Sequence, residues 1–119
     1  MDIRHLSPRF AVSEQLQPCD LAEVAARGFR AVVCNRPDGE APEQPGWRDV
    51  AAEARQLGLA FAYIPVVPGE ISTDQVREFA RFLEAAKGPV LGYCRTGARA
   101  EKLWERAATP AVRPGPSVP

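Results

Sequence analysis

Short apolar runs alternate with segments of helical periodicity along most of this chain, and glycine or proline separates them. The strand-like runs cover residues 10–12, 29–35, 59–66 and 89–93. The helix-like segments cover residues 17–28, 47–57, 73–87 and about 98–107. Strands that alternate with helices form mainly parallel sheets. We therefore predict an α/β fold with a mainly parallel central sheet and helices on both faces.

Local signals mark where these helices begin and end. Gly28 and Gly58 each follow a helical segment and suit the left-handed stop that glycine adopts most easily. Ser72 and Gln75 form an S-x-x-Q capping box, which predicts the start of the third helix. Gly88 is expected to end that helix.

The chain has 119 residues, which suits one compact domain with a single core. We expect residues 1–108 to form this domain. The last segment, TPAVRPGPSVP at residues 109–119, is rich in proline and has no hydrophobic period. A segment of this composition buries too little apolar surface to fold, so we predict a disordered tail.

The charge balance narrows the classes of partner. Fifteen basic and fifteen acidic residues cancel, which argues against binding to nucleic acid or to a membrane surface through bulk charge. No run approaches the roughly 20 apolar residues that span a bilayer. The first ten residues, MDIRHLSPRF, lack the apolar core of a signal peptide. A cytoplasmic location is the expectation.

The cysteine content also excludes several classes of site. Cys19, Cys34 and Cys94 are too few and too scattered for a disulfide framework. The chain has no C-x-x-C pair and a single histidine, His5, whereas a structural zinc site needs four placed ligands. We therefore expect neither a metal nor a cofactor.

The segment GPVLGYCRTGARAEKLWERA places Cys94 between a strand and a helix. A helix N-terminus and nearby cations such as Arg99 both favour the thiolate, which is the reactive form of cysteine. Gly97 permits a tight curl in which backbone N–H groups converge on an anion. We predict Cys94 as a nucleophile acting with Arg99 on a small anionic or persulfide substrate. The expected binding loop consists of Arg95, Thr96, Gly97, Ala98 and Arg99.

Three further candidates stand where the strand at residues 29–35 ends, because ligands of parallel sheets bind at the carboxyl ends of strands. Cys34 is a candidate resolving thiol for an oxidised or persulfidated Cys94. The alternative is that Cys34 is a small core residue. Asn35 or Arg36 is expected to hydrogen-bond the cysteine loop. For Arg36 the alternative is a structural ion pair at the end of the sheet.

Several motifs resemble known families. YCRTGAR, at residues 93–99, resembles the active-site loop of rhodanese sulfurtransferases. The order AVSEQL, GFRAVVCNRPDGE, YIPVVPGEI and then the cysteine loop is similar to cysteine-dependent phosphatases of the dual-specificity group. The whole pattern, over residues 1–107, resembles the beta-lactamase hydrolase-like protein, phosphatase-like domain family. Its members are described as phosphatases or as sulfur transferases. Fusion of related domains to sulfur-handling enzymes implies a partner enzyme of that kind.

Two departures from the phosphatase pattern bear on the reaction. Tyrosine phosphatases have five residues between cysteine and arginine, but four separate Cys94 from Arg99, and Tyr93 stands where they carry histidine. They also place an acidic aspartate after the strand that corresponds to YIPVV. Here Glu70 or Asp74 would have to act as the proton donor, unless each is only a solvated charge. Sulfur transfer needs no strong proton donor, so these departures favour sulfur chemistry.

The main expectation is therefore a rhodanese-like sulfurtransferase. The Cys94 thiolate would take sulfane sulfur from thiosulfate or a persulfide and hold it as a persulfide. Arg95 would face the mouth of the site, and Arg99 would turn back to brace the loop. The alternative is a tyrosine or dual-specificity-like phosphatase, which forms a phosphocysteine on Cys94 while Arg99 clamps the phosphoryl oxygens. A second alternative is a non-catalytic sulfur carrier or sensor.

Overall fold

The computed structural model describes residues 1–108, so the predicted tail at 109–119 lies outside the described residues. The strands are β1 (Arg4–Ser7), β2 (Phe10–Ser13), β3 (Ala31–Cys34), β4 (Ala60–Tyr63) and β5 (Val90–Tyr93). The helices are α1 (Leu21–Ala26), α2 (Trp47–Gln56), α3 (Thr73–Ala85) and α4 (Ala98–Ala108), and a short 3-10 turn, η1 (Pro18–Asp20), leads into α1. From β2 onward, strands and helices occur in the predicted order.

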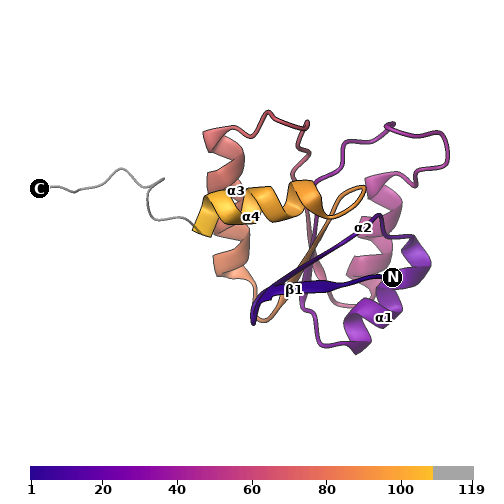
Figure 1. Ribbon diagram of the computed structural model, residues 1–119. Coiled ribbons are helices and arrows are strands. Elements are labelled where there is room, and N and C mark those ends of the chain that lie inside the picture. Colours follow the sequence, from indigo (N-terminus) through magenta and orange to yellow (C-terminus); the bar gives the residue numbers. More distant parts are fainter. Residues whose placement is uncertain (109–119) are drawn as a thin grey trace, which may run out of the picture.

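The strands form one sheet in the order β1-β2-β5-β3-β4. β2, β5, β3 and β4 run parallel to their neighbours, and only β1 is antiparallel to its partner among the described strands. Helices α1 and α2 lie on one side of the sheet, and α3 and α4 lie on the other (Figure 1). The prediction of a mainly parallel α/β sheet between helices is confirmed.

The register of the parallel strands brings their carboxyl ends to one edge of the sheet. Tyr93 of β5 is paired with Ser13 of β2 on one side and with Cys34 of β3 on the other. Cys34 is in turn paired with Tyr63 of β4. The segments that follow these four strands therefore start side by side, and the chain after Tyr93 starts in the middle of them.

Two strands differ from the sequence-based expectation. β1 was not predicted, because its four residues show no clear alternation and are ordered by antiparallel pairing with β2. β4 was predicted to be buried, but it is the edge strand, with Ala60 exposed and the rest half-buried. β4 is apolar because α2 packs against it: the Trp47 ring stacks on Tyr63 at 4.6 Å and on Phe61 at 6.2 Å.

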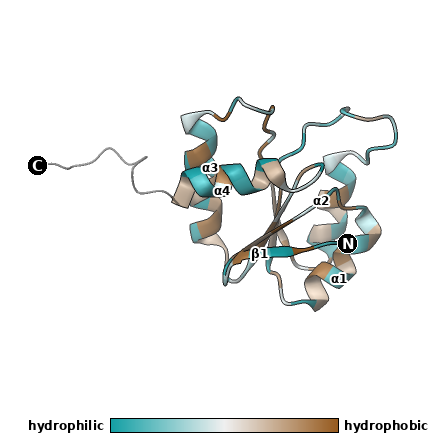
Figure 2. Ribbon diagram, viewed as in Figure 1, coloured by the Kyte–Doolittle hydropathy of each residue, from teal (hydrophilic) through white to brown (hydrophobic). Residues whose placement is uncertain are grey.

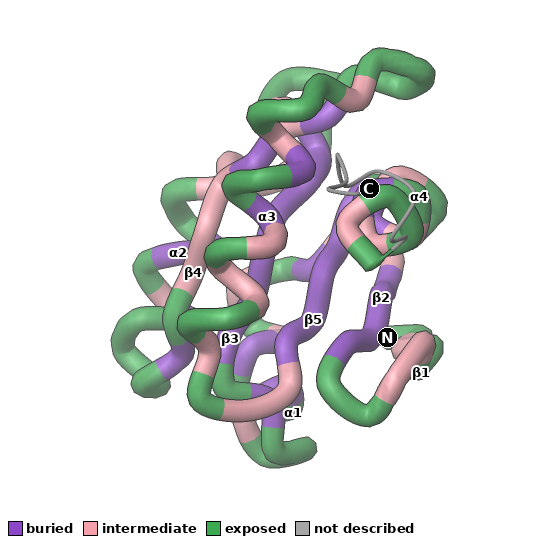
Figure 3. The backbone as a smooth tube through the Cα atoms, turned by 90° about the vertical axis from the view of Figure 1, so that its left-hand side faces the viewer, coloured by how far each residue is buried: buried purple, intermediate pink, exposed green. Residues whose placement is uncertain are grey.

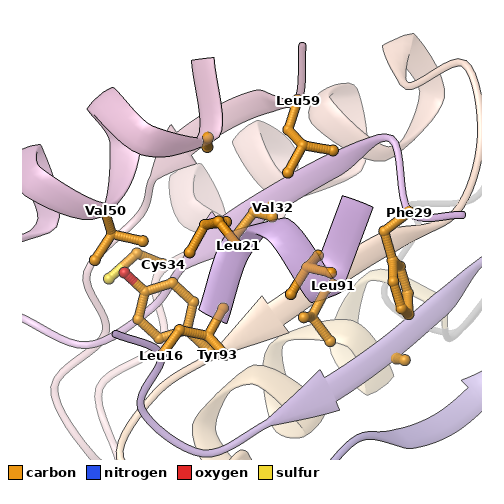
Figure 4. Close-up of a cluster of buried hydrophobic side chains, with 12 residues drawn as sticks. Leu16, Leu21, Phe29, Val32, Cys34, Val50, Leu59, Leu91 and Tyr93 are labelled. Carbon is orange, nitrogen blue, oxygen red and sulfur yellow. The ribbon is translucent and has the colours of Figure 1, made fainter. Parts of the chain in front are cut away.

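The sheet separates two hydrophobic cores, and β5 is buried along its length between β2 and β3 (Figure 3). The first core lies under α1 and α2 and includes Leu21, Val50 and Leu91, with Tyr93 and Cys34 at its end (Figure 4). The second core lies under α3 and α4. Its larger buried members are Phe10, Val33, Ile64, Phe79 and Leu103. Successive residues of each central strand therefore serve opposite cores, as the alternation of a strand requires.

The predicted helix start after Ser72 and the predicted ends at Gly28 and Gly58 rest on the expected local geometry. The Ser72 hydroxyl accepts a hydrogen bond from the Gln75 N–H at 3.1 Å, and the Gln75 side chain accepts one from the Ser72 N–H at 3.0 Å. Gly28 and Gly58 have φ of 96° and 80°, the left-handed values expected after a helix. Helices α3 and α4 carry hydrophilic and hydrophobic bands, as helices that cover one face of a sheet do (Figure 2). None of the helices within residues 1–108 combines the length and apolar character that crossing a bilayer requires.

The prediction that Gly88 ends the third helix is wrong. Helix α3 ends at Ala85, and Ala86 is already extended, with φ −69° and ψ 139°. Gly88 does not adopt a left-handed conformation. It leaves room for Arg30, because a methyl group at position 88 would lie 2.4 Å from the Arg30 Cγ atom.

Gly92 in β5 allows α4 to pack closely against the sheet. A methyl group at this position would lie 2.8 Å from Phe10 Cζ and 3.3 Å from Ala100 Cβ. The Phe10 ring has little freedom to move, because Phe79 meets it edge-on at 5.4 Å and Trp104 stacks on it at 6.0 Å. Because residue 92 has no side chain, helix α4, which begins at Ala98, can pack closely against β5.

We predict that Gly92→Ala destabilises the protein by about 1–3 kcal/mol, because the added methyl group overpacks a core in which Phe10 is held on two sides. Urea denaturation of the two proteins measures the difference. The matched control is the same change in a Phe10→Leu background, where the ring atom in closest approach is absent and the cost of Gly92→Ala falls. A Gly92→Ala protein as stable as the wild type would contradict this packing.

Candidate active site

Cys94 is the first residue after β5, at the edge of the sheet where the parallel strands end. Backbone hydrogen bonds tie its neighbours to the adjacent segments. The Asn35 N–H donates to the Tyr93 carbonyl at 2.8 Å, and the Gln15 N–H donates to the Arg95 carbonyl at 3.3 Å. Cys94 is thus held between the segments that follow β2 and β3, in the place where α/β sheets bind ligands.

The loop from Cys94 to Arg99 curls back on the sulfur atom. The Gly97 N–H donates to the Cys94 Sγ at 3.0 Å, which is the direction in which a backbone nest holds an anion. Gly97 has a φ of 99°, a left-handed value that favours glycine. Helix α4 begins at the next residue, so its N-terminus lies at this sulfur. Gly97 therefore serves the curl that the sequence predicted.

Arg99 projects from the first turn of α4 and is held by Glu40. Its Nη1 and Nη2 atoms donate to the two carboxylate oxygens of Glu40 at 2.7 and 2.8 Å, and Nη1 also donates to the Val66 carbonyl at 3.0 Å. Glu40 raises the pKa of Arg99, and the nearby Cys94 adds to this effect. The guanidinium is thus braced beside the cysteine by a bidentate pair.

Arg36 completes this network from the end of β3. Its Nε donates to Glu40 at 3.0 Å, and its Nη1 donates to the Gln15 side chain at 3.0 Å. One carboxylate therefore lies between two guanidinium groups. The Arg99 guanidinium, with help from Arg36, lowers the pKa of Glu40 to about 2. Glu40 is consequently ionised over the whole physiological range.

A hollow of about 640 Å³ opens over this network, lined by Gln15, Arg36, Glu40, Arg95 and Arg99 among others. Thr96 and Ala98 border a second, smaller hollow together with Arg95 and Arg99. Cys94 itself is only 1% exposed, beneath the loop whose side chains line these hollows. Arg95 and Arg99 are therefore in the walls of both hollows, whereas the linings of these two hollows do not include Cys94.

The accessory candidates lie in different surroundings. Asp74 pairs loosely with Arg77 at 3.9 Å and its side chain is 95% exposed. Glu70 is exposed, and its N–H closes a turn with the Val67 carbonyl at 2.9 Å. Among residues 1–108, the structure gives neither carboxylate a hydrogen bond or ion pair to the cysteine loop. Their role as proton donors stays a prediction.

Asn35 and Cys34 flank the cysteine loop from β3. The Asn35 side chain donates to the Ile64 carbonyl at 2.8 Å, and its buried Oδ1 has no hydrogen-bond partner within residues 1–108. The Cys34 thiol donates to the Arg36 carbonyl at 3.4 Å and faces the core beside the Tyr93 hydroxyl (Figure 4). Burial raises the pKa of the Cys34 thiol. Its resolving role stays a prediction.

Residues at the site that were not predicted from the sequence include Glu40 and Gln15, and also Glu43 and Lys102 in the walls of the hollows. A signal for Glu40 was present, because it follows Arg36 by four residues in the NRPDGE motif. Its main partner is Arg99, which is 59 residues away in the chain. Nothing local to Gln15 marks its contacts with Arg36 and with the Arg95 carbonyl.

Comparison with known proteins identifies the relatives of this chain. The family described as beta-lactamase hydrolase-like protein, phosphatase-like domain, matches residues 2–111. The chain belongs to this family. Curated beta-lactamase hydrolase-like proteins of Xylella fastidiosa and Agrobacterium fabrum are 36% and 32% identical to it over 104 and 99 residues. These stretches are 87% and 83% of this chain, but only 24% and 23% of the relatives' own length.

Solved structures agree with the family. A Neisseria meningitidis protein with a provisional phosphatase name is 33% identical, with a TM-score of 0.84 over 96% of this chain and 81% of that one. Pseudomonas aeruginosa TpbA, solved with pTyr, has a TM-score of 0.64 at 20% identity, over 87% of this chain and 61% of that one. The fold is that of cysteine-dependent phosphatases. These findings support the phosphatase alternative rather than the sulfurtransferase expectation.

We predict that Glu40→Gln destabilises the protein at neutral pH by about 1–2 kcal/mol, an amount reduced by partial exposure of the pair. The pKa of Glu40 is about 2 in the folded state and about 4.3 in an unfolded chain. The unfolded chain therefore binds more protons between these values, and stability from Glu40 is full above about pH 4.3 and lost as pH falls through 2.

Urea denaturation at pH 7 and at pH 3 tests this expectation. The difference between the wild type and Glu40→Gln should shrink at the lower pH. Glu84→Gln, on α3 away from the cysteine loop, is the control for loss of a carboxylate. A difference for Glu40→Gln that is the same at both pH values would show that its ionisation does not stabilise the fold.

Proposed function

We propose that this domain hydrolyses phosphate monoesters through a phosphocysteine intermediate on Cys94. The observation that carries the proposal is the Gly97 N–H aimed at the Cys94 sulfur at 3.0 Å, at the N-terminus of α4 and beside Arg99. A phosphatase-like fold and relatives named as phosphatases support the same chemistry. The Gly97 N–H, the N-terminus of α4 and the Arg99 guanidinium each stabilise negative charge. In this reaction both the thiolate nucleophile and the phosphate substrate are negatively charged.

In the first step, the Cys94 thiolate attacks the phosphorus atom. An S–P bond forms, and the bond from phosphorus to the ester oxygen breaks. The leaving alkoxide or phenoxide takes a proton. In the second step, water attacks the phosphocysteine, the S–P bond breaks, and inorganic phosphate leaves while the thiolate is restored. Backbone N–H groups of the loop and the Arg99 guanidinium stabilise the phosphoryl oxygens in both steps.

Glu40 determines the orientation of the Arg99 guanidinium before a substrate binds. Its carboxylate takes both terminal nitrogens of the guanidinium. A phosphoryl group that approaches Arg99 must compete with Glu40 for these donors or share them. The pair thus orients Arg99 before a substrate binds, and the incoming oxyanion displaces Glu40 from Arg99 as it approaches Cys94.

The proton for the leaving group has a candidate source in Glu43. Two carboxyl groups line the larger hollow, Glu40 and Glu43. Glu40 is already engaged, because its two carboxylate oxygens accept hydrogen bonds from Arg36 and Arg99. Glu43 is exposed on the loop between β3 and α2, and no cation pairs with it within residues 1–108. We assign it the role of general acid.

We predict that the wild type releases phosphate from 4-nitrophenyl phosphate and that Cys94→Ser lowers this rate about a thousandfold or more. Cys19→Ser is the matched control, because Cys19 is an exposed free thiol outside the loop, and it should keep full activity. A parallel assay with thiosulfate and cyanide measures sulfur transfer. Cys94-dependent thiocyanate without phosphate release would reject the proposal in favour of sulfur transfer. Neither product, with a stable Cys94 persulfide, would point to a carrier.

We predict that Glu43→Gln slows hydrolysis of phenyl phosphate about a hundredfold and that of 4-nitrophenyl phosphate much less. Phenoxide is a poor leaving group and needs a proton in the transition state, whereas nitrophenoxide leaves unaided. Glu70→Gln and Asp74→Asn, measured on the same two substrates, test the remaining carboxyl candidates. Equal loss on both substrates for Glu43→Gln would rule out proton donation by this residue.

A further inference from the structure

A second hollow, of about 280 Å³, shares Pro68, Arg95 and Arg99 with the larger hollow of the candidate active site. Its walls come from the loop after β4, from the cysteine loop and from the start of α4. Pro68, Gly69, Thr96 and Ala98 form its uncharged lining. Its charged lining consists of Arg95, Arg99 and Lys102, and no carboxylate contributes to it. The larger hollow differs, because Glu40 and Glu43 line it together with its arginines.

Arg99 is paired with Glu40, which it shares with Arg36, so one positive charge remains on that group of three. Arg95 and Lys102 add the positive charge of the smaller hollow that no carboxylate meets. Neither side chain has a carboxylate within ion-pair distance in the part of the chain that the structure describes. Other cations near the cysteine loop are paired. Arg4 meets Glu101 at 3.1 Å, and Arg36 meets Glu40 at 3.0 Å.

The two unpaired cations are placed to act together with Cys94. Arg95 directly follows the nucleophile in the loop. Lys102 lies one helical turn beyond Ala98 on α4, so both positions face the same side of that helix. Arg95 and Arg99 line both hollows. A group bound in the smaller hollow is thus adjacent to a group bound at the cysteine loop.

We infer that the substrate carries a second anionic group, which Arg95 and Lys102 bind in the smaller hollow while the reacting phosphate lies over Cys94. This inference rests on the proposed function for the reacting group. The substrate class is a small phosphate ester with a second oxyanion, either a carboxylate or a second phosphate, on a short carbon skeleton. Pro68 and Ala98 give that skeleton an apolar wall. Two charge-assisted contacts then select an ester that carries a second anionic group over one that has only the reacting phosphate.

Calorimetric binding to the Cys94→Ser protein tests the inference without need of turnover. The probes are 4-carboxyphenyl phosphate and its neutral isostere, 4-carbamoylphenyl phosphate. We expect the carboxylate to bind about tenfold more tightly at low salt, and the preference to shrink as salt screens it. Added Lys102→Gln should bring the ratio of dissociation constants to within about twofold. Added Lys87→Gln, at a cation before β5 that lies far from the cysteine loop, should leave the ratio at tenfold.

A third probe, 4-(phosphonomethyl)phenyl phosphate, identifies the preferred second group. Tighter binding than the carboxylate, lost with Lys102→Gln, assigns the smaller hollow to a second phosphate. Weaker binding than the carboxylate, with the same dependence on Lys102, assigns it to a carboxylate. Lys102 is exposed on α4, so its replacement leaves the fold intact, and circular dichroism verifies this.

Two outcomes overturn the inference. One is equal affinity for the carboxylate and the carbamoyl probe. The other is a preference that survives Lys102→Gln, which would place the second anion elsewhere. Phosphate release by the protein with Cys94 intact separates this result from the proposed function. Release without a charge preference keeps the phosphatase and rejects the second site. A Lys102-dependent preference without release keeps the second site and rejects the phosphatase.

Discussion

Parallel pairing of β2, β5 and β3 is the constraint on which the candidate site depends. Because Ser13, Tyr93 and Cys34 are paired across these strands, the three following segments leave the sheet at one edge. Cys94 starts the middle segment, and Gly92 lets α4 pack down on β5 immediately behind it. The local curl at Gly97 places the sulfur at the N-terminus of α4, and the sheet brings the loop that carries Glu40 to the same place.

The electrostatic arrangement at that edge follows from one carboxylate and two arginines. Arg36 comes from the end of β3 and Arg99 from the start of α4, and Glu40 binds both. Two neighbouring guanidinium groups would repel one another in an empty site, so a carboxylate between them keeps both in place. Both guanidinium groups are thus held beside the cysteine loop before an anion binds. The cost is that the donors of Arg99 are occupied until an anion competes for them.

The sequence was sufficient for those features that depend on neighbouring residues. The capping box at Ser72, the left-handed Gly28 and the curl at Gly97 were all predicted, because each is decided within a few residues. β1 and the edge position of β4 were not, because strand order depends on pairing between distant segments. The Glu40–Arg99 pair was missed for the same reason. The short spacing from Cys94 to Arg99 favoured sulfur chemistry, whereas the fold and the relatives favour phosphate chemistry.

Cys94 is buried and the neighbouring Arg99 is held by Glu40, so these two features determine which anions reach the sulfur. Glu40 is ionised from about pH 4 upward, so its competition with an incoming anion does not vary across the physiological range. A carboxylate that holds two arginines is displaced more readily by a doubly charged phosphoryl group than by a singly charged anion. A second anionic group held at Arg95 and Lys102 adds binding energy that is independent of this exchange. The charge of the substrate is then tested at two places before it reaches Cys94. The first is the Glu40–Arg99 pair, and the second is the hollow with Arg95 and Lys102.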